Sequence, residues 1–311
     1  MNNYINNINK DNSMKNHFTA EISKHPCFNK EASKNYGRVH LPVAKSCNIS
    51  CNYCHRDYDC QNESRPGVTS SLLSPEEAVN RIYEVKRFLG DISVAAVAGP
   101  GDSLAEPLNT MKTFELVKKE FPDIILCMST NGLNLSDNLE ELLDTGVRFI
   151  TVTLNAIDVS VARNIYRYVD YKNIIYTDKE AAEILLEKQI KGIERAVKTG
   201  FTIKINSVLI PGINDFHIKD IAEQAKKLGV YLFNVMPMIP AKNSYFEKIG
   251  VKGAVRKDVT DITKGIEGIN IMEHCRQCRS DAAGLLGEDL SGKLISEKGG
   301  LKCECSKKMR F

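Results

Sequence analysis

From residue 36 onward, short apolar runs rich in Ile and Val alternate with longer amphipathic stretches. The apolar runs carry little charge, as buried strands of a parallel sheet do. They predict strands over 38–44, 92–98, 124–129, 148–154, 202–209 and 231–235. The stretches between them have the spacing of surface helices. They predict helices near 75–89, 109–119, 136–144, 179–199 and 216–228.

The boundaries of these helices carry their own signals. Ser74 precedes Pro75 and Glu77, so the first helix is predicted to start with an N-cap serine and a capping box. Gly200 and Gly229 each follow a predicted helix, as C-terminal glycines do. Six such β-then-α units in series predict a parallel α/β sheet with right-handed crossovers. A TIM-like barrel, partial or full, and an open doubly wound sheet both satisfy this pattern. The first strand lacks a following GxGxxG, which counts against a dinucleotide-binding fold.

Both ends of the chain depart from the alternation. Residues 1–24 are rich in Asn and poor in core-forming residues, which predicts a mobile tail. Residues 25–240 then form the α/β body together with a short segment before its first strand. Residues 241–311 lose the βα pattern and contain four cysteines, so we interpret them as a C-terminal cluster-binding extension.

Bulk composition excludes little, but the cysteine total is informative. The chain has 311 residues, 26% charged residues and a net charge of +3, which gives no argument for nucleic acid or membrane binding. No apolar run reaches the roughly 18 residues of a membrane span, and we see no secretory signal, so we expect a cytoplasmic protein. Most of the 10 cysteines lie in tight local sets, which in a reducing compartment indicate metal sites.

Unusual polar and glycine-rich sequences follow the predicted strands. They are Cys47–Cys54, Gly99–Asp102, Ser129–Gly132, Asn155–Asp158, Pro211–Gly212 and Met236–Pro237, in strand order. The carboxyl ends of parallel strands meet at one edge of a sheet or barrel, where α/β proteins build their active sites. We therefore expect these segments to converge on one site.

The first of these segments has the spacing C-x3-C-x2-C, formed by Cys47, Cys51 and Cys54. Three thiolates on one loop can hold three irons of a [4Fe–4S] cluster and leave the fourth iron open. In radical SAM enzymes that iron binds the methionine part of S-adenosylmethionine (SAM), and Tyr53 fits the aromatic residue found before the third cysteine. The alternative is a zinc knuckle with His55 or Cys60 as fourth ligand. The place of the motif after the first βα strand favours the cluster.

Several strand-end residues are candidates for contacts with SAM. Backbone carbonyls and a carboxylate suit an ammonium group, which makes Gly99, Gly101 and Asp102 candidates for the SAM amino group. Candidates for its ribose, adenine or carboxylate are Ser129, Asn131, Thr153, Asn155 and Asn206. For each of these, stabilisation of a turn is the alternative role. Ile205 is a candidate for packing on adenine, but a place in the hydrophobic core is the preferred interpretation of this isoleucine.

The remaining cysteines suggest further metal chemistry. Cys275 and Cys278 form a C-x2-C, for which zinc, a redox pair or a second cluster are all open. A lone cysteine is most often a small buried apolar residue. However, His25, Cys27, Cys60 and Cys127 are all placed to converge on the mouth of the barrel, and together with the C-x2-C they suffice for two more clusters. Cys303 and Cys305 lie too close together and too near the end of the sequence to be assigned a role, and thiols of a flexible tail are the ordinary explanation.

Longer runs carry a specific resemblance. The chain resembles the NifB family, the radical SAM proteins of nitrogenase cofactor assembly, at His25-Pro26-Cys27, the C-x3-C-x2-C loop, Asn62–Val68 and Cys275–Asp289. The similarity covers roughly residues 25–290. The resemblance implies a radical SAM TIM-like barrel with N- and C-terminal cluster-binding extensions. It assigns Cys47, Cys51 and Cys54 to the SAM-binding cluster. It assigns the ligands of two substrate [4Fe–4S] clusters to His25, Cys27, Cys60, Cys127, Cys275 and Cys278.

The resemblance also implies the activity and its partners. The family fuses the two substrate clusters, inserts a carbide taken from a SAM methyl group and adds a sulfite-derived sulfur, which makes an eight-iron precursor. Glu63 and Arg65 match a family motif and are expected to act in this reaction, with a salt bridge as the alternative. Expected partners are iron–sulfur and electron donor proteins and a downstream cofactor scaffold or carrier. The stretch Ser103–Glu106 departs from the family pattern, and the chain resembles the form without a fused carrier domain.

Two other functions remain open at this point. One is a radical SAM enzyme of another kind with auxiliary clusters, such as a peptide-modifying or activating enzyme. The other is an electron carrier of ferredoxin type. An electron carrier has no need of SAM-binding groups at several strand ends, so turnover of SAM separates it from both enzymes.

Overall fold

A computed structural model describes residues 19–62, 64–66, 68 and 70–290. Its main sheet contains the six expected strands, which are β1 (Gly37–His40), β3 (Ile92–Val97), β4 (Ile125–Thr130), β5 (Phe149–Thr153), β8 (Thr202–Leu209) and β9 (Leu232–Pro237). All neighbouring pairs among them are parallel, in the order β9-β8-β5-β4-β3-β1. The predicted parallel α/β sheet is therefore confirmed.

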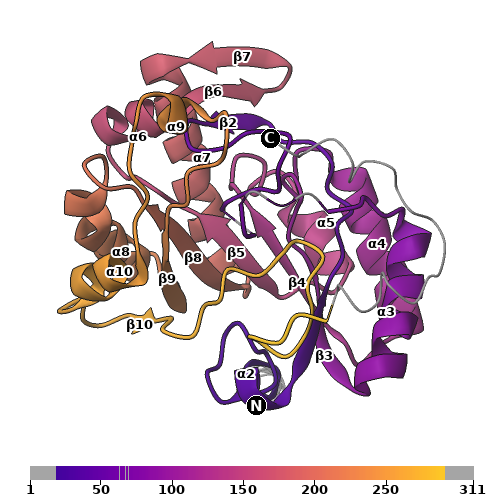
Figure 1. Cartoon of the computed structure of the whole chain (residues 1–311). Coiled ribbons are helices and arrows are strands. Elements are labelled where there is room, and N and C mark those ends of the chain that lie inside the picture. Colours follow the sequence, from indigo (N-terminus) through magenta and orange to yellow (C-terminus); the bar gives the residue numbers. More distant parts are fainter. Residues whose placement is uncertain (1–18, 63, 67, 69, 291–311) are drawn as a thin grey trace, which may run out of the picture.

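The sheet is an open partial barrel. Two short strands from the C-terminal part extend its edges: β10 (Asn270–Ile271) pairs with β9, and β11 (Ala283–Gly284) pairs antiparallel with β1. Among the described residues, β1 and β9 therefore lie at opposite sides of the sheet without pairing with each other. Figure 1 shows the strands side by side with the long helices behind and beside them, which is the arrangement of a barrel and not of a doubly wound sheet.

The predicted helices are present close to their expected bounds. They are α3 (Pro75–Leu89), α4 (Pro107–Glu120), α5 (Leu139–Asp144), α7 (Asp178–Lys198) and α8 (Ile218–Lys227), the last preceded by the 3-10 helix η1 (Asp215–His217). The capping box of α3 is confirmed, since the Glu77 amide donates to Ser74 Oγ at 3.2 Å and the Ser74 amide donates to the Glu77 carboxylate at 2.7 Å. None of the described helices is long and apolar enough to cross a membrane.

A second sheet escaped the sequence prediction. After α6 (Val159–Ile165), strands β6 (Tyr166–Tyr171) and β7 (Ile174–Thr177) form a hairpin, and β2 (Ile49–Cys51) pairs with β6. The turn of this hairpin is Lys172-Asn173, both with positive φ, at 55° and 63°. A two-residue turn with positive φ at both positions usually has the sequence Asn-Gly or Asp-Gly, and Lys172-Asn173 does not match either.

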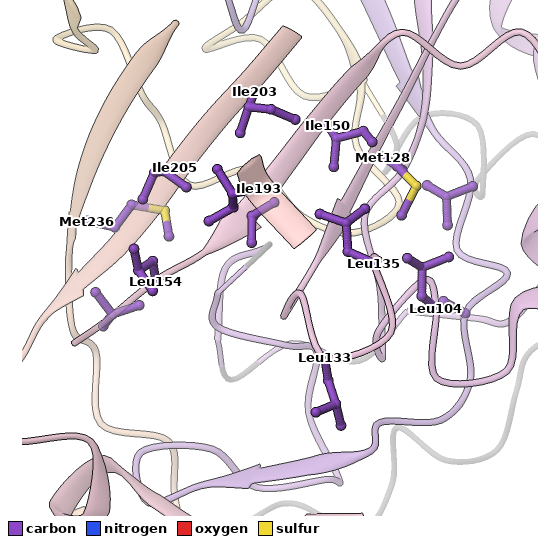
Figure 2. Packing of buried hydrophobic residues seen from close by; sticks show 14 of the residues in the cluster. Leu104, Met128, Leu133, Leu135, Ile150, Leu154, Ile193, Ile203, Ile205 and Met236 are labelled. Carbon is purple, nitrogen blue, oxygen red and sulfur yellow. The ribbon is translucent and has the colours of Figure 1, made fainter. Parts of the chain in front are cut away.

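The sheet has two different faces. On the helix-facing side, alternate strand residues pack with apolar residues of α3, α4, α7 and α8 in the main core. Figure 2 shows Ile203 and Ile205 of β8 in this core beside Ile193 of α7. On the inner side, a smaller apolar cluster contains Phe28, Cys127 and Phe149, and the rings of Phe28 and Phe149 lie 5.0 Å apart.

The segments flanking the barrel both reach its inner side. Residues 19–22 are helical and Ile22 is buried in the inner cluster, so the packed part of the chain begins before residue 25. The short helix α2 (Ala32–Asn35) then leads into β1. Residues 1–18, which make up most of the expected mobile tail, lie outside the described residues.

The C-terminal extension is more structured than its sequence suggested. It contains α9 (Tyr245–Lys248), α10 (Arg256–Thr263), β10 and β11. Because β10 and β11 lie at opposite edges of the sheet, residues 272–282 must cross it from one side to the other, and Figure 1 shows this segment passing over the inner face. This crossing carries Cys275 and Cys278 to the inside. Cys303 and Cys305 lie outside the described residues.

Candidate functional site

The three cysteines of the C-x3-C-x2-C loop line one recess at the carboxyl end of the sheet. Cys47, Cys51 and Cys54 share this recess with Cys60, and its other lining residues are Ile49, Ser50, Arg56, Asn62, Asp102 and Asn131. The structure thus brings together the thiols of the loop and polar residues from the ends of β3 and β4. We call these residues the thiol recess.

The loop that carries the three cysteines is held by backbone bonds. Its β2 strand pairs with β6, and on its other side the Gly101 amide donates to Ala44 O and the Asp102 amide to Ser46 O, both at 2.7 Å. A Cβ on Gly101 would lie 2.1 Å from Ser46 O and 2.7 Å from Ser46 C. Glycine is needed at this position because two backbones approach each other too closely for a side chain.

Replacing Gly101 by alanine is therefore expected to destabilise the protein by about 3 kcal/mol or more, because the clashing Ser46 atoms belong to the backbone. Urea unfolding of the cluster-free protein measures this effect. Gly212→Ala is the matched control. Gly212 has a φ of +76° but open space around it, so only the backbone cost of about 1–2 kcal/mol is expected. Equal losses for the two variants would contradict the close-approach explanation.

The thiols of the recess have donors within reach. Asn131 Nδ2 donates to Cys47 Sγ at 3.9 Å, and Asn62 Nδ2 donates to Cys51 Sγ at 3.8 Å. The Arg56 guanidinium lies within electrostatic range of Cys47, Cys54 and Cys60. Donors and a cation of this kind stabilise thiolates, which are the form that binds iron.

Without a metal, burial keeps these thiols protonated. Burial, followed by the charge of Cys54, raises the pKa of Cys51 to about 12. Burial likewise raises the pKa of Cys47 well above its ordinary value, and Asp102 adds to this effect. Iron binding must therefore displace protons from the recess. Three thiols on one loop, with amide donors aimed at two of them, fit the donor set of a [4Fe–4S] cluster.

Tyr53 connects the cysteine loop to the ends of the central strands. Its side chain is fully buried, and its hydroxyl accepts from Asn155 Nδ2 at 2.7 Å and donates to Asn62 Oδ1. Asn206 Nδ2 donates to Asn62 O at 3.0 Å. The amide groups of Asn155 and Asn206, which were candidates for SAM contacts, thus form hydrogen bonds within the protein that position the loop.

The other candidates for SAM contacts differ in whether their polar atoms already form hydrogen bonds within the protein. Asp102 accepts from the Leu104 amide at 2.9 Å, from Thr130 Oγ1 at 3.1 Å and from the Asn131 amide. Burial raises the pKa of its carboxyl, and these hydrogen bonds counteract the effect. Thr153 Oγ1, in contrast, is buried without a hydrogen-bond partner among the described residues.

Gly99 and Ser129 take different places in the site. Gly99 has a φ of +106°, and a Cβ there would lie 3.2 Å from Ser280 Cβ, so this glycine lets the C-terminal segment approach the strand end. Ser129 lies near the carboxyl end of β4 and is 9% exposed.

Ile205 does not lie at the site. It is fully buried in the core on the helix-facing side of β8, beside Ile193 (Figure 2). Neighbouring residues of a strand point to opposite faces of the sheet. The side chains of Lys204 and Asn206 point to the inner face, so the side chain of Ile205 points to the helix-facing side. Of the two roles considered for Ile205, the structure supports that of a core residue and not packing on adenine.

A second group of thiols lies on the inner face of the sheet. Cys27 and Cys275 pack with Cys127 of β4 in the inner apolar cluster. The thiol of Cys278 lies 3.1 Å from Nη2 of Arg38, a fully buried residue of β1. Cys27 is within electrostatic range of both Cys275 and Cys278. We call Cys27, Cys127, Cys275 and Cys278 the inner cysteine group. The sixth proposed cysteine or histidine ligand of the two substrate clusters, Cys60, lines the thiol recess.

Two histidines accompany the inner cysteine group. His25 is fully buried, its Nδ1 accepts from the Cys27 amide at 3.2 Å, and its Nε2 has no hydrogen-bond partner among the described residues. Burial, and then Lys204, lowers its pKa well below the ordinary value. His40 was missed by the sequence analysis. Its Nδ1 donates to Arg279 O at 2.9 Å, which leaves a lone pair on Nε2, so His40 can serve as a nitrogen ligand.

Three residues of the inner face could have been found from the sequence. Arg38, His40 and Lys204 are polar residues at alternate positions of strands that otherwise read as buried. Charged side chains are almost never fully buried without a partner or a function. Their period-two spacing marks the face of the strand that lines the site.

The pair Glu63 and Arg65 is only partly described. Glu63 lies outside the described residues, and Arg65 is exposed and does not line the thiol recess. The Arg65 amide donates to Cys278 O at 2.7 Å, so its backbone joins the cysteine loop segment to the C-terminal crossing. Among the residues that the structure describes, no three His, Cys, Asp or Glu side chains gather at the spacing of a single metal ion.

Comparisons with known proteins agree with this geometry. Residues 41–225 match the radical SAM superfamily. The chain is 44% identical over 281 residues to the "FeMo cofactor biosynthesis protein NifB" of Herbaspirillum seropedicae, with 89% of this chain and 54% of that protein covered. It is 41% identical over 281 residues to the protein of the same name from Chlorobaculum tepidum, with 90% and 66% covered. The chain thus spans between about half and two thirds of the length of these relatives.

Solved structures share the fold of this chain. Streptococcus suis SuiB bound to S-adenosylmethionine superposes with a TM-score of 0.53 at 14% identity, over 77% of this chain and 51% of that chain. Methylornithine synthase (PylB) superposes with a TM-score of 0.52 at 14% identity, over 75% and 70%. At these identities the likeness shows the fold alone.

Proposed function

The chain belongs to the radical SAM superfamily, and we propose that it acts in nitrogenase cofactor biosynthesis as a NifB-type enzyme. The observation that supports this most directly is the presence of two separate thiol groups on one barrel. The thiol recess suits the cluster that binds SAM, and the inner cysteine group suits iron–sulfur substrates. A ferredoxin-type electron carrier has no need of SAM-binding groups, and a radical SAM enzyme with auxiliary clusters is separated from this proposal by its products.

In this proposal Cys47, Cys51 and Cys54 hold the SAM-binding [4Fe–4S] cluster. When bound, that cluster supplies the electron that cleaves a C–S bond of SAM. The protein contributes the amide donors Asn62 and Asn131, which point at the ligating sulfurs. Of the candidates at the strand ends, Thr153 offers a free buried hydroxyl for SAM, and Gly99, Gly101 and Asp102 remain the proposed site of its amino group.

The substrates of the proposed reaction are two [4Fe–4S] clusters. His25, Cys27, Cys127, Cys275 and Cys278 would hold them on the inner face, and Cys60 would hold one of them next to the SAM site. The reaction fuses the clusters around a carbide that comes from a SAM methyl group and adds one sulfur. Glu63 and Arg65 are proposed to act in this step. The partners would be iron–sulfur and electron donors and a cofactor scaffold or carrier, in the cytoplasm.

Anaerobic reconstitution with iron and sulfide, followed by addition of SAM, tests the proposal. We expect about twelve iron atoms per chain, corresponding to three cubanes, and both 5′-deoxyadenosine and S-adenosylhomocysteine as products. The first product reports radical cleavage and the second reports methyl transfer. A peptide-modifying enzyme would make 5′-deoxyadenosine without cluster-dependent S-adenosylhomocysteine, and an electron carrier would make neither. Either result would contradict the proposed function.

A further inference from the structure

We infer that the inner face of the barrel carries a binding site for an anion, with Lys204 and Arg38 as its two cations. The ligand class is an iron–sulfur cluster held by thiolates, which carries net negative charge. The inference rests on the proposed function, because it names what recognises the proposed iron–sulfur substrates. It concerns how they are held and not the reaction performed on them.

Lys204 is the first cation of this site. It lies on the inner face of β8 and is 7% exposed, although its strand is otherwise buried. Its ammonium group lies 5.4 Å from the centre of the Phe28 ring, and it makes no hydrogen bond or ion pair with any described residue. The ammonium group of Lys204 is within electrostatic range of Cys27 and Cys127 of the inner cysteine group and of the histidines His25 and His40. A buried ammonium without a counter-charge lowers stability, so its presence calls for a ligand.

Arg38 is the second cation and enters from the opposite side. It is 1% exposed on β1 and donates through Nη1 to Gly284 O and to Leu285 O, the latter at 3.0 Å. Its Nη2 points at Cys278 Sγ, and its buried Nε has no hydrogen-bond partner among the described residues. Neutral carbonyls and a thiol satisfy its geometry but leave its positive charge unbalanced. No ion pair with a described carboxylate balances it.

The thiols complete the argument about charge. The inner cysteine group lies beside both cations, since Arg38 Nη2 is 3.1 Å from Cys278 Sγ and Lys204 is within electrostatic range of Cys27 and Cys127. Asp289 is within electrostatic range of His40 on this face, but neither Lys204 nor Arg38 forms an ion pair with a described carboxylate. When the thiols release protons and bind a cluster, the thiolates bring more negative charge than the iron–sulfur core brings positive charge. Lys204 and Arg38 then have the counter-charge that the protein alone does not provide.

Lys204→Met tests this inference, because methionine keeps the apolar length of the side chain and removes its charge. In the cluster-free protein we expect Lys204→Met to be at least as stable to heat as the parent, since a buried unpaired charge is removed. After anaerobic reconstitution we expect its inner clusters to bind about tenfold more weakly in iron titrations. We also expect a more negative reduction potential for the EPR signals that do not respond to SAM. Lys204→Arg should restore both properties, and the exposed Lys242→Met is the matched control.

The outcomes separate this inference from the proposed function. If Lys204→Met melts earlier than the parent and takes up iron with unchanged affinity and potential, Lys204 is a packing residue and the inference is wrong. If the parent makes S-adenosylhomocysteine and the eight-iron product, and Lys204→Met has the same cluster affinity and reduction potential as the parent, the proposed function is supported and the anion-site inference is wrong. If the parent binds three cubanes, and Lys204→Met binds the inner ones more weakly, but the parent transfers no methyl group, the anion site is supported and the proposed function is wrong. Iron for only one cubane in the parent overturns the assigned ligand class.

Discussion

Replacing Cys47, Cys51 and Cys54 together by alanine is expected to abolish radical cleavage of SAM, with a loss of more than about a thousandfold in 5′-deoxyadenosine formation. Each single alanine variant should show nearly the same loss. The three thiols line one recess and each is expected to bind a different iron, so the loop has no spare ligand. Anaerobic turnover with chromatography of the products measures the effect.

Cys60 offers a sharper version of the same experiment, because it lines the thiol recess without belonging to the C-x3-C-x2-C loop. Cys60→Ala is expected to keep 5′-deoxyadenosine formation while losing iron and S-adenosylhomocysteine. Cys303→Ala is the control for the substitution itself, since Cys303 lies outside the matched region and outside the described residues. Normal 5′-deoxyadenosine yield from the triple variant would disprove the assignment of the loop.

The double variant Cys275→Ala/Cys278→Ala is expected to lose the final product while keeping the SAM-binding cluster. Both residues lie on the crossing segment at the inner face, away from the thiol recess. Iron should fall by about four to eight atoms per chain, and some 5′-deoxyadenosine should still form by unproductive cleavage. S-adenosylhomocysteine should fall as well, because methyl transfer needs a sulfur of a substrate cluster as acceptor. No product able to activate cofactor-deficient nitrogenase should form.

A structural zinc at Cys275 and Cys278 is the alternative that this experiment must exclude. Zinc would stabilise the C-terminal segment directly, so its loss would unfold residues that pair with β1. Metal analysis of the parent decides the matter: one zinc per chain, with iron for a single cubane, would contradict the NifB-type proposal and leave the radical SAM core intact. The variant Cys303→Ala/Cys305→Ala controls for the removal of two thiols and should retain all iron.

The sequence alone determined the βα order of the barrel because the signals for it are local. The strand over residues 202–209 and the helix over 75–89 have the bounds that their patterns predicted. Alternation of apolar residues, the Ser74–Glu77 capping box and the glycines after helices act within a few residues of one another. The place of the C-x3-C-x2-C loop at the carboxyl end of the first strand followed from the same order.

Other features of the sheet could not be predicted from local signals. The β6–β7 hairpin turns through Lys172-Asn173, which form an uncommon sequence for two residues of positive φ. The partial barrel, as opposed to a doubly wound sheet, depends on which face the helices cover, and that is settled by packing. The core role of Ile205 was already preferred from the sequence, and the register of β8 determines it, since a shift by one residue exchanges the two faces of a strand.

Only the tertiary structure decided how the proposed metal ligands divide between the thiol recess and the inner face. The family resemblance assigned Cys60 to a substrate cluster, and the fold adds that its thiol lines the same recess as Cys47, Cys51 and Cys54. Arg38 meets Cys278 across 240 residues of chain, because β10 and β11 attach to opposite edges of the sheet and force residues 272–282 over its inner face. Local patterns determine elements, but which buried charges and thiols face one another depends on long-range strand pairing. The cysteine spacing is therefore readable from the sequence, whereas the inner site forms only when β1 and β8 and the crossing segment 272–282 come together in the folded sheet.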